Sequence, residues 1–159
     1  MKEFFDRTGV MSIGTRLKML SERVVKDAEK MCDLYNIDMK HKWYPVVYVL
    51  MYDDNGKTVT QIANEIGHSH VSVIKIIKEM SKEEIIYQSK DEYDARKTNI
   101  FLSPKGKKIA KNLTYQFEDT SIAIDKMLSK MQHNLWLALD EFETLMDEKS
   151  TFPRVLEEK

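Results

Sequence analysis

The sequence is 159 residues long, 42% hydrophobic and 32% charged, which is the composition of an ordinary globular domain. It has no apolar run near the roughly 18 residues of a membrane helix, no signal-peptide pattern at its start and one cysteine, so we expect a cytoplasmic protein without an internal disulfide. The net charge is −1, but residues 57–112 hold eleven Lys/Arg against seven Asp/Glu, whereas residues 113–159 hold five against ten. This charge distribution is typical of a protein whose basic central part binds phosphate groups while its acidic tail does not.

A long helix is predicted from Ile13 to Tyr35, with Ser12 as its N-cap. Apolar residues recur along it at spacings of three and four, which is typical of one helical stripe. The stripe consists of Ile13, Leu17, Leu20, Val24, Ala28, Met31 and Tyr35. Trp43–Tyr52 are apolar on almost every side, which predicts a buried helix with Pro45 in its first turn. Asp53–Gly56 then form a turn.

Two shorter helices are expected next. Thr58 and Gln61 have the spacing of a capping box, which begins a short helix that ends at Gly67. Ser69 can cap the helix after it. The residues expected to face the core are Ile62, Ala63, Ile66, Val73, Ile76, Ile77 and Met80. The residues expected to face outward are Val71, Lys75, Lys78 and Lys82, with Ile74 at the edge. This is a helix-turn-helix pattern.

A hairpin and two further helices complete the chain. Residues 85–90 and 97–102 are predicted strands on either side of the polar turn Asp91–Arg96. Ser103 as N-cap and Pro104 at the first helical position begin another long helix. Its apolar residues are Ile109, Leu113, Phe117, Ile124, Met127, Leu128 and Met131. Gln132–Asn134 mark a bend before a last helix that carries Leu135, Leu139, Phe142 and Met146.

The expected fold is mostly α with a small β-hairpin. One domain, residues 1–159, would comprise a winged helix-turn-helix lobe over about 43–103 and a helical dimerisation region over about 10–36 and 104–149. The apolar stripes of the flanking helices exceed what the short centre can cover, which indicates a homodimer. The alternative is that the same helices form an intramolecular bundle.

The segments TVTQIANEIGHSHVSVIKIIKEM (58–80) and DARKTNIFLSPKG (94–106) resemble the helix-turn-helix and the wing of the MarR family of bacterial transcriptional regulators. The resemblance implies a homodimer that binds double-stranded DNA at a pseudo-palindromic site, without a cofactor. Two departures stand out. The family usually has glycine near position 84, where this chain has Glu84, and the wing turn contains Asp91, Glu92 and Asp94, which lower its positive charge.

A narrower resemblance concerns the regulator half of proteins that fuse a MarR module to a GNAT-type acetyltransferase. It rests on IGTRLKMLSERV, KWYPVVYVL, GHSHVSVIKIIKEMS and HNLWLALDEFE. The five glycines are too scattered for the Arg/Gln-x-x-Gly-x-Gly turn that binds acetyl-CoA. No Ser/His/Asp or paired-carboxylate arrangement stands out either. We therefore expect a stand-alone regulator that is not an enzyme.

The second of the two short helices is expected to enter the major groove with its N-terminus. Its candidate contact residues are Ser69, His70, Val71, Ser72, Ile74, Lys75 and Lys78. The hydroxyl, imidazole and ammonium groups can donate to phosphates or base edges. Val71 and Ile74 are apolar where solvent is expected, so one hypothesis is that they pack on thymine methyl groups. The alternative is surface variation or partial burial.

The hairpin supplies the second candidate contact. An arginine at its tip, Arg96, can enter an A·T-rich minor groove, where the negative potential is enhanced. Asp94 can orient the guanidinium by a charge-assisted hydrogen bond. Lys90 and Lys97 would contact the flanking phosphates. The alternative for Arg96 is a local surface ion pair.

Other candidate sites are less specific. Trp43, Tyr44, Tyr48 and Tyr52 lie where relatives bind small effectors, although such residues are more often core. The four histidines do not have the spacing of metal ligands, so no metal is expected. Cys32 is a candidate for a redox-active thiol, with a buried core thiol as the alternative.

The favoured function is a sequence-specific DNA-binding transcriptional regulator, a repressor released by a small-molecule effector. The alternative is a winged-helix module for protein contact, acting with a partner such as an acetyltransferase. The basic surplus of residues 57–112 and Arg96 favour DNA.

Overall fold

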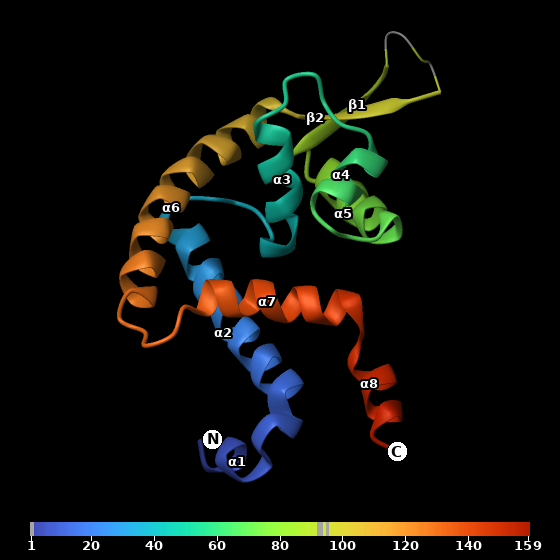
Figure 1. The fold of residues 1–159 in the computed structure, drawn as a ribbon. Coiled ribbons are helices and arrows are strands. Elements are labelled where there is room, and N and C mark those ends of the chain that lie inside the picture. The colour runs from blue at the N-terminus through green and yellow to red at the C-terminus, as the bar shows by residue number, and fades with distance from the viewer. Residues whose placement is uncertain (1, 92–93, 95) are drawn as a thin grey trace. The chain divides into compact units, whose positions relative to one another are not determined.

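The computed structural model describes residues 2–91, 94 and 96–159 (Figure 1). The chain divides into two compact units, Met1–Gln116 and Phe117–Lys159. None of the helices within the described residues is long and apolar enough to cross a membrane.

The first unit begins with helices α1 (Lys2–Thr8) and α2 (Ile13–Leu34), joined by the 3-10 turn η1 (Gly9–Ser12). Helix α2 begins at the predicted residue, but the prediction that the Ser12 side chain caps it is wrong. The Ser12 hydroxyl donates to the Gly9 carbonyl at 2.9 Å and accepts from the Thr8 hydroxyl at 2.8 Å, so the preceding turn uses it. The first half of the α2 stripe is exposed: Ile13, Leu17, Leu20 and Val24.

A winged-helix lobe follows. Its elements are η2 (His41–Trp43), α3 (Tyr44–Met51), α4 (Val59–Glu65), α5 (His70–Lys82), β1 (Ile86–Lys90) and β2 (Thr98–Leu102). The strands are antiparallel, with Ile86 opposite Leu102 and Lys90 opposite Thr98. The most deeply buried side chains are Val46, Val47, Ile62, Val73, Met80, Ile85 and Ile100. Each contributes about 1.5–3 kcal/mol of gross hydrophobic stabilisation, so this core fixes the lobe.

Side-chain caps start the later helices of this unit where they were predicted. The Thr58 N–H donates to Gln61 Oε1 at 2.8 Å and the Gln61 N–H to Thr58 Oγ1 at 3.3 Å, which is the capping box of α4. Ser69 accepts from the Ser72 N–H at 3.2 Å. Ser103 accepts from the Gly106 N–H at 3.0 Å, at the start of α6 (Pro104–Leu128). Such a cap contributes about 1 kcal/mol.

Helix α5 ends at a residue in the left-handed region. Glu84 has φ 57°, the conformation that favours glycine. Its N–H donates to the Ser81 carbonyl at 3.2 Å, and the Ile85 N–H reaches the Met80 carbonyl at 3.0 Å. This hydrogen-bond pattern ends a helix and turns the chain sharply. The left-handed conformation of Glu84 explains why glycine suits this position. Because the chain turns here, the first strand begins at Ile86, one residue later than predicted.

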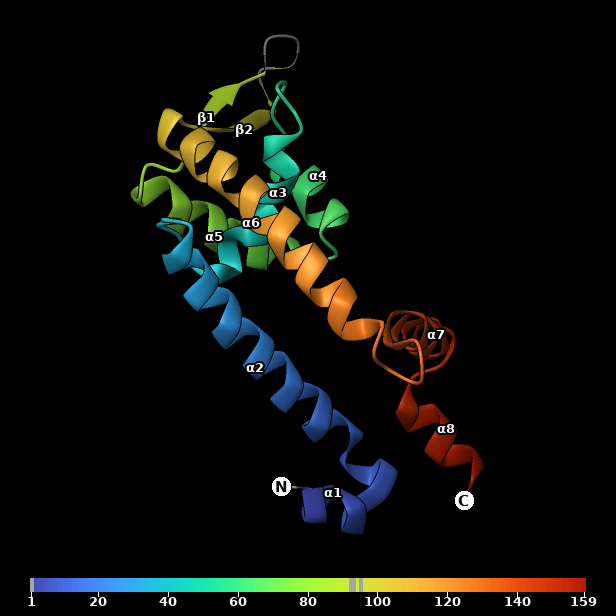
Figure 2. The same cartoon turned by 90° about the vertical axis from the view of Figure 1, so that its left-hand side faces the viewer.

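The first turn of α6 lies against the start of the hairpin (Figure 2). The Ser103 hydroxyl donates to the Glu84 carbonyl at 2.6 Å, and the Ser103 N–H to the Ile85 carbonyl at 3.0 Å. A Cβ added at Gly106 would lie 2.1 Å from the Ile85 carbonyl oxygen. Gly106 therefore permits an approach that holds the hairpin base on α6.

The second unit contains the end of α6, α7 (Leu135–Glu148) and α8 (Thr151–Glu157). Helix α6 stops at Leu128, so the prediction that Met131 lies on this helix is wrong. The break includes the predicted bend at Gln132–Asn134, and Asn134 caps α7 by accepting from the Leu137 N–H at 3.1 Å. The short helices α1 and α8 were not predicted.

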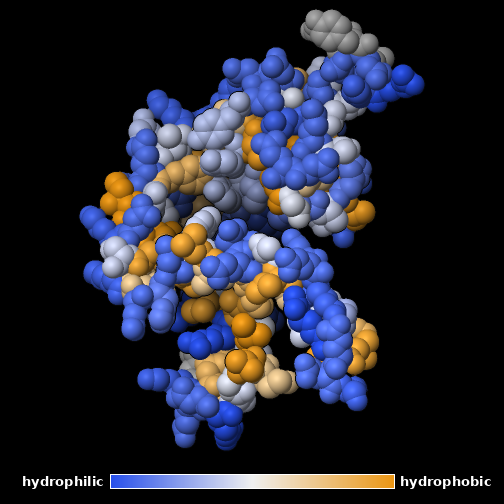
Figure 3. Space-filling view, in the orientation of Figure 1, coloured by the Kyte–Doolittle hydropathy of each residue, from blue (hydrophilic) through white to orange (hydrophobic). Residues whose placement is uncertain are grey.

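Apolar side chains are exposed throughout the second unit, and orange groups mark several of them in Figure 3. The most exposed are Ile122, Met127, Trp136, Leu137, Leu145, Phe152 and Leu156. None of the residues 117–159, all of which the structure describes, is buried. Continuous apolar exposure of this kind marks an interaction surface.

Candidate nucleic-acid interface

The N-terminus of α5 carries the polar candidates. Ser69 precedes the helix as its N-cap, and its hydroxyl lies 2.8 Å from that of Ser72. His70 is the first helical residue and is exposed. Main-chain N–H groups at a helix N-terminus favour negatively charged ligands. The two serine hydroxyls are thus engaged in capping, and each keeps some capacity for a further hydrogen bond.

The two faces of α5 differ as the sequence predicts. Val73, Ile76, Ile77 and Met80 are buried in the lobe. On the other side Val71 is 63% exposed, and Lys75 and Lys78 are exposed. Ile74 is half-buried at the edge between the faces, which fits both the methyl-contact hypothesis and partial burial. One side of the helix anchors it and the other offers an apolar group and two ammonium groups.

The hairpin end presents Arg96. Its side chain is 93% exposed, and its Nε lies 3.3 Å from Asp94 Oδ1. The same oxygen accepts the Arg96 main-chain N–H at 3.1 Å. The contact between Asp94 and Arg96 therefore exists and involves Nε, so the two Nη groups can serve a second acceptor.

Asp91 accepts hydrogen bonds from two described residues that follow it in the hairpin. Asp91 accepts the Asp94 N–H through Oδ1 at 2.9 Å and the Asn99 amide through Oδ2 at 2.8 Å. Lys90 is the exposed last residue of β1, and Lys97 is exposed just before β2. The acidic turn predicted at 91–94 includes Glu92 and Tyr93, which lie outside the described residues. Asp91 accepts the main-chain N–H of Asp94, and Asp94 accepts that of Arg96, so these carboxylates do more than lower the positive charge of the hairpin end.

Lys57 is a positioning residue that the sequence did not indicate. Its Nζ lies 3.1 Å from Asp53 Oδ2 and 2.9 Å from Glu65 Oε2, and its backbone pairs with Ile100 beside β2. Hydrogen bonds to Glu65 and Asp53 raise the pKa of Lys57, and the bond from Lys57 lowers the pKa of Asp53. This residue ties the turn after α3, helix α4 and the hairpin together.

The aromatic residues proposed for an effector have different environments. Trp43 is 2% exposed, and its Nε1 donates to Glu79 Oε2 at 3.3 Å. The rings of Tyr44 and His41 are stacked, with centroids 6.3 Å apart. Burial raises the pKa of the Tyr44 hydroxyl. Tyr48 and Tyr52 are exposed, with ring centroids 5.2 Å apart. Trp43 ends η2, Tyr44 and Tyr48 lie on α3, and Tyr52 follows that helix, so the four rings differ in burial and in the element that carries them.

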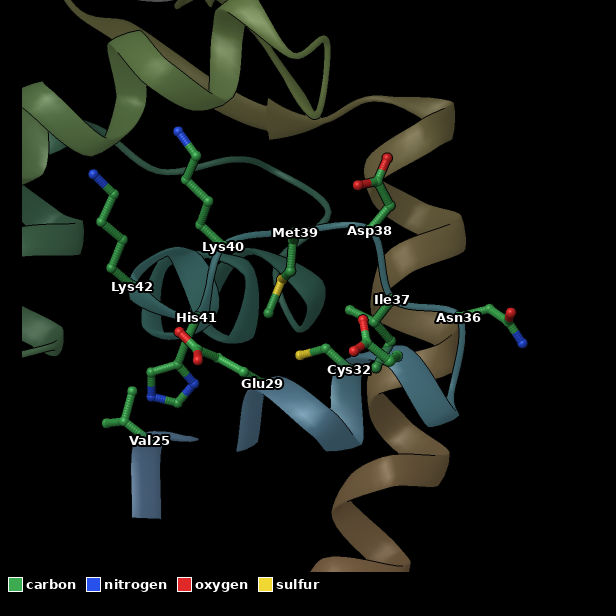
Figure 4. Close-up of a pocket in the computed structure, with 11 residues that line it drawn as sticks. Val25, Glu29, Cys32, Asn36, Ile37, Asp38, Met39, Lys40, His41 and Lys42 are labelled. Carbon is green, nitrogen blue, oxygen red and sulfur yellow. The ribbon is translucent and has the colours of Figure 1, made fainter. Parts of the chain in front are cut away.

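A cavity of about 850 Å³ lies between the end of α2 and the segment that leads to α3. Figure 4 shows the Cys32 sulfur, Met39 and His41 around this space, with Lys40 and Lys42 extending away from it. The lining residues are Val25, Glu29, Cys32, Asp33, Asn36, Ile37, Asp38, Met39, Lys40, His41 and Lys42. A smaller cavity of about 320 Å³ is lined by Trp43, together with Asp38, Met39, Lys40, Glu83, Ile85 and Lys105. The larger cavity thus involves residues that the sequence did not indicate.

Cys32 lines the larger cavity and is 6% exposed. Burial, followed by the nearby Asp33 and Glu29, raises the pKa of its thiol. A raised pKa disfavours the reactive thiolate. Among the described residues, no group of three or more His, Cys, Asp or Glu side chains is arranged to hold a metal ion.

Comparison with known proteins identifies the fold. No protein-family model matches the chain. Transcriptional regulator AdcR of Streptococcus pyogenes serotype M6 is 29% identical over 92 residues, which are 58% of this chain and 63% of AdcR, so the match spans less than two thirds of that relative.

Similar solved structures cover most of the chain. They include the Staphylococcus aureus MepR–DNA complex (TM-score 0.69, 19% identity, 85% of this chain and 97% of that one) and the transcriptional repressor CouR bound to a 23-mer DNA duplex (0.65, 16%, 88% and 96%). AdcR from Streptococcus pyogenes has a TM-score of 0.61 and 25% identity over 86% of this chain and 96% of its own. The chain therefore has the winged-helix fold of MarR-family regulators, as predicted.

Proposed function

We propose that this chain is a sequence-specific DNA-binding transcriptional repressor of the cytoplasm, acting as a homodimer and released by a small molecule. One observation carries the proposal. One face of helix α5 is buried in the lobe, and the other exposes Val71, Lys75 and Lys78. The hairpin end adds the exposed Arg96, whose side chain contacts Asp94. The names of the chain's relatives are consistent with the proposal: AdcR is a transcriptional regulator, and MepR and CouR were solved with DNA.

In this proposal α5 lies in the major groove, with Ser69, His70 and Ser72 at its entry. Val71 and Ile74 contact thymine methyl groups, and Lys75 and Lys78 contact phosphate or guanine. Arg96 reaches the adjacent minor groove, and Lys90 and Lys97 contact phosphates beside it. Two copies related by a two-fold axis would read half-sites about one DNA turn apart.

The dimer part of the proposal is supported by the apolar side chains exposed on both units. In the first unit Val10, Met11 and Val24 are 63–88% exposed, and in the second Trp136 and Phe152 are 71–72% exposed. All of these residues except Phe152 lie in the proposed dimerisation regions, about 10–36 and 104–149. Exposed apolar surfaces of this kind are typical of helices that pair with a second copy. The narrower relation to the regulator half of acetyltransferase fusions remains a proposal from the sequence segments alone.

We assign the effector to the 850 Å³ cavity at the end of α2 and to the 320 Å³ cavity, which shares Asp38, Met39 and Lys40 with it. Trp43 lines the smaller one, Tyr44 and Tyr48 follow it on α3, and Tyr52 comes just after that helix. A ligand in the 850 Å³ cavity would contact Cys32, Met39 and His41.

Selection of genomic DNA fragments with the purified protein tests the proposal. We expect enrichment of one pseudo-palindromic site and co-migration of two chains with one site. Recovery of unrelated fragments without enrichment would refute sequence-specific binding. A metabolite screen for release of the enriched site then tests the effector.

A further inference from the structure

Glu79 links helix α5 to the segment that walls the large cavity. Its carboxylate accepts from Lys42 Nζ at 2.7 Å and from Trp43 Nε1 at 3.3 Å, and Lys40 Nζ lies 3.6 Å away. The hydrogen bond from Lys42, with further help from Trp43 and Lys40, lowers the pKa of Glu79, so the group stays ionised. Lys40 also lies over the Trp43 ring at 5.1 Å. We name Glu79, Lys40, Lys42 and Trp43 the Glu79 cluster.

The segment that supplies these donors contributes to the walls of two cavities. Asp38, Met39 and Lys40 line both the 850 Å³ cavity and the 320 Å³ cavity. Close-packed segments resist displacement because their neighbours must move with them, whereas a segment beside empty space can shift at lower cost. Segment 38–42 is therefore the part of the cavity wall that a bound molecule could move.

The second cavity reaches the C-terminal end of α5. Lys105 Nζ donates to the Glu83 carbonyl at 3.0 Å and lies 4.0 Å from Asp38 Oδ2. The movable segment thus meets α5 at Glu79 and, through Lys105, at Glu83. A displacement of residues 38–42 would act on the last turn and the C-cap of the same helix.

We infer that Glu79 is a positioning residue that couples the cavity wall at 38–43 to the DNA-reading helix α5. This inference rests on the proposed function and specifies its regulation. With the Glu79 cluster formed, α5 is preorganised for DNA. A molecule that displaces segment 38–42 withdraws the donors from Glu79 and loosens α5. Because coupling is reciprocal, DNA bound to α5 must also change access to the cavity.

The first test compares Glu79→Gln with Glu83→Gln. Both remove one negative charge near the end of α5, but only Glu79 accepts from Lys42 and Trp43. We expect Glu79→Gln to lower the ratio of operator to non-specific DNA affinity by about threefold to tenfold, and Glu83→Gln to leave it unchanged. Lys42→Gln, an exposed side chain whose loss threatens the fold less, should reproduce the lowered ratio. Equal ratios in all three variants and the wild type would overturn the inference.

The second test uses Cys32, the single cysteine, as a reporter inside the cavity. The rate of its modification by an aromatic disulfide reagent is measured with and without operator DNA. We expect DNA to change this rate in the wild type and in Glu83→Gln, and to change it much less in Glu79→Gln. The same DNA effect in Glu79→Gln as in the wild type would overturn the coupling, although DNA binding itself stands. A wild type that binds no operator would instead refute the proposed function and the inference with it.

Discussion

Gly106 lies directly under the main chain of Ile85, so that a Cβ at Gly106 would come within 2.1 Å of the Ile85 carbonyl oxygen. The obstacle is backbone, which cannot swing aside as a side chain tip can. We expect Gly106→Ala to lower the free energy of unfolding by about 3 kcal/mol, measured by urea denaturation. Gly14→Ala is the matched control, because Gly14 is also helical and has nothing within 4 Å of an added Cβ. It should raise stability by about 0.5–1 kcal/mol; an equal loss in both variants would contradict the packing argument.

At position 84 we expect a substitution by glycine to raise stability. Glu84 has φ 57° at the end of α5, a conformation that costs a residue with a Cβ about 1 kcal/mol. Glu84→Gly should therefore raise the free energy of unfolding by about 0.5–1 kcal/mol in the same assay, although glycine usually destabilises. Glu84→Gln separates charge from conformation and should change little. A loss of stability in Glu84→Gly would mean that the conformation carries no strain.

Lys57 should give the lobe a stability that depends on pH. Lys57→Met removes both ion pairs, and at pH 7 we expect a loss of about 1 kcal/mol. The folded pKa of Asp53 is lowered, so its contribution is present above its unfolded pKa and disappears as pH falls through the folded value. The folded pKa of Lys57 is raised, so its contribution is lost only at alkaline pH. The stability difference between wild type and variant should therefore shrink below about pH 4 and persist across neutral pH.

A surface pair provides the control for that series. Lys18 lies 3.9 Å from Glu22, and both side chains are more than 60% exposed. Lys18→Met should leave the free energy of unfolding unchanged at every pH. A pH-independent difference for Lys57→Met would show that the lysine stem, and not its charge, matters.

Arg96 should contribute to affinity and not to folding, since its side chain is 93% exposed. We expect Arg96→Ala to weaken operator binding about tenfold, with the larger loss on sites whose flanks are A·T-rich. Asp94→Asn should weaken binding less, because the guanidinium remains but its orienting partner is altered. Wild-type affinity of Arg96→Ala across several salt concentrations would contradict the role of the hairpin.

Substitutions of Val71 and Lys75 can distinguish base recognition by α5 from its contacts with phosphates. Val71→Ala and Ile74→Ala should relax the preference for thymine at specific positions of the site, measured by competition with base-substituted duplexes. Lys75→Ala should weaken binding evenly across sequences and reduce the salt dependence by about one phosphate. If the two apolar variants keep the wild-type preference, their side chains do not read methyl groups.

Local interactions explain why so much of the fold could be predicted. The caps at Thr58, Ser69 and Ser103 depend on atoms within three residues, so the sequence carries them directly. Ser12 has the same chemistry, but a turn that precedes it takes its hydroxyl. Helices α1 and α8 have seven residues each, too short for a clear apolar period.

Contacts between distant segments account for what the sequence did not indicate. Lys42 and Glu79 are 37 residues apart, and nothing in the segments that contain them indicates that they meet. The cavity beside Cys32 depends on how the segment after α2 returns to α5, which no periodicity encodes. The candidate DNA contacts could be named because they follow from exposed positions on one helix and one turn, whereas the contact between Lys42 and Glu79 joins two segments that are distant in the sequence.

We propose that the exposed face of α5 and Arg96 recognise a specific DNA sequence. Titration of a labelled duplex that carries the selected site, in parallel with a scrambled duplex and at several salt concentrations, tests it most directly. We predict at least a thousandfold preference for the selected site and a linear fall of log affinity with log salt. Equal affinity for the two duplexes, or none for either, would contradict the claim.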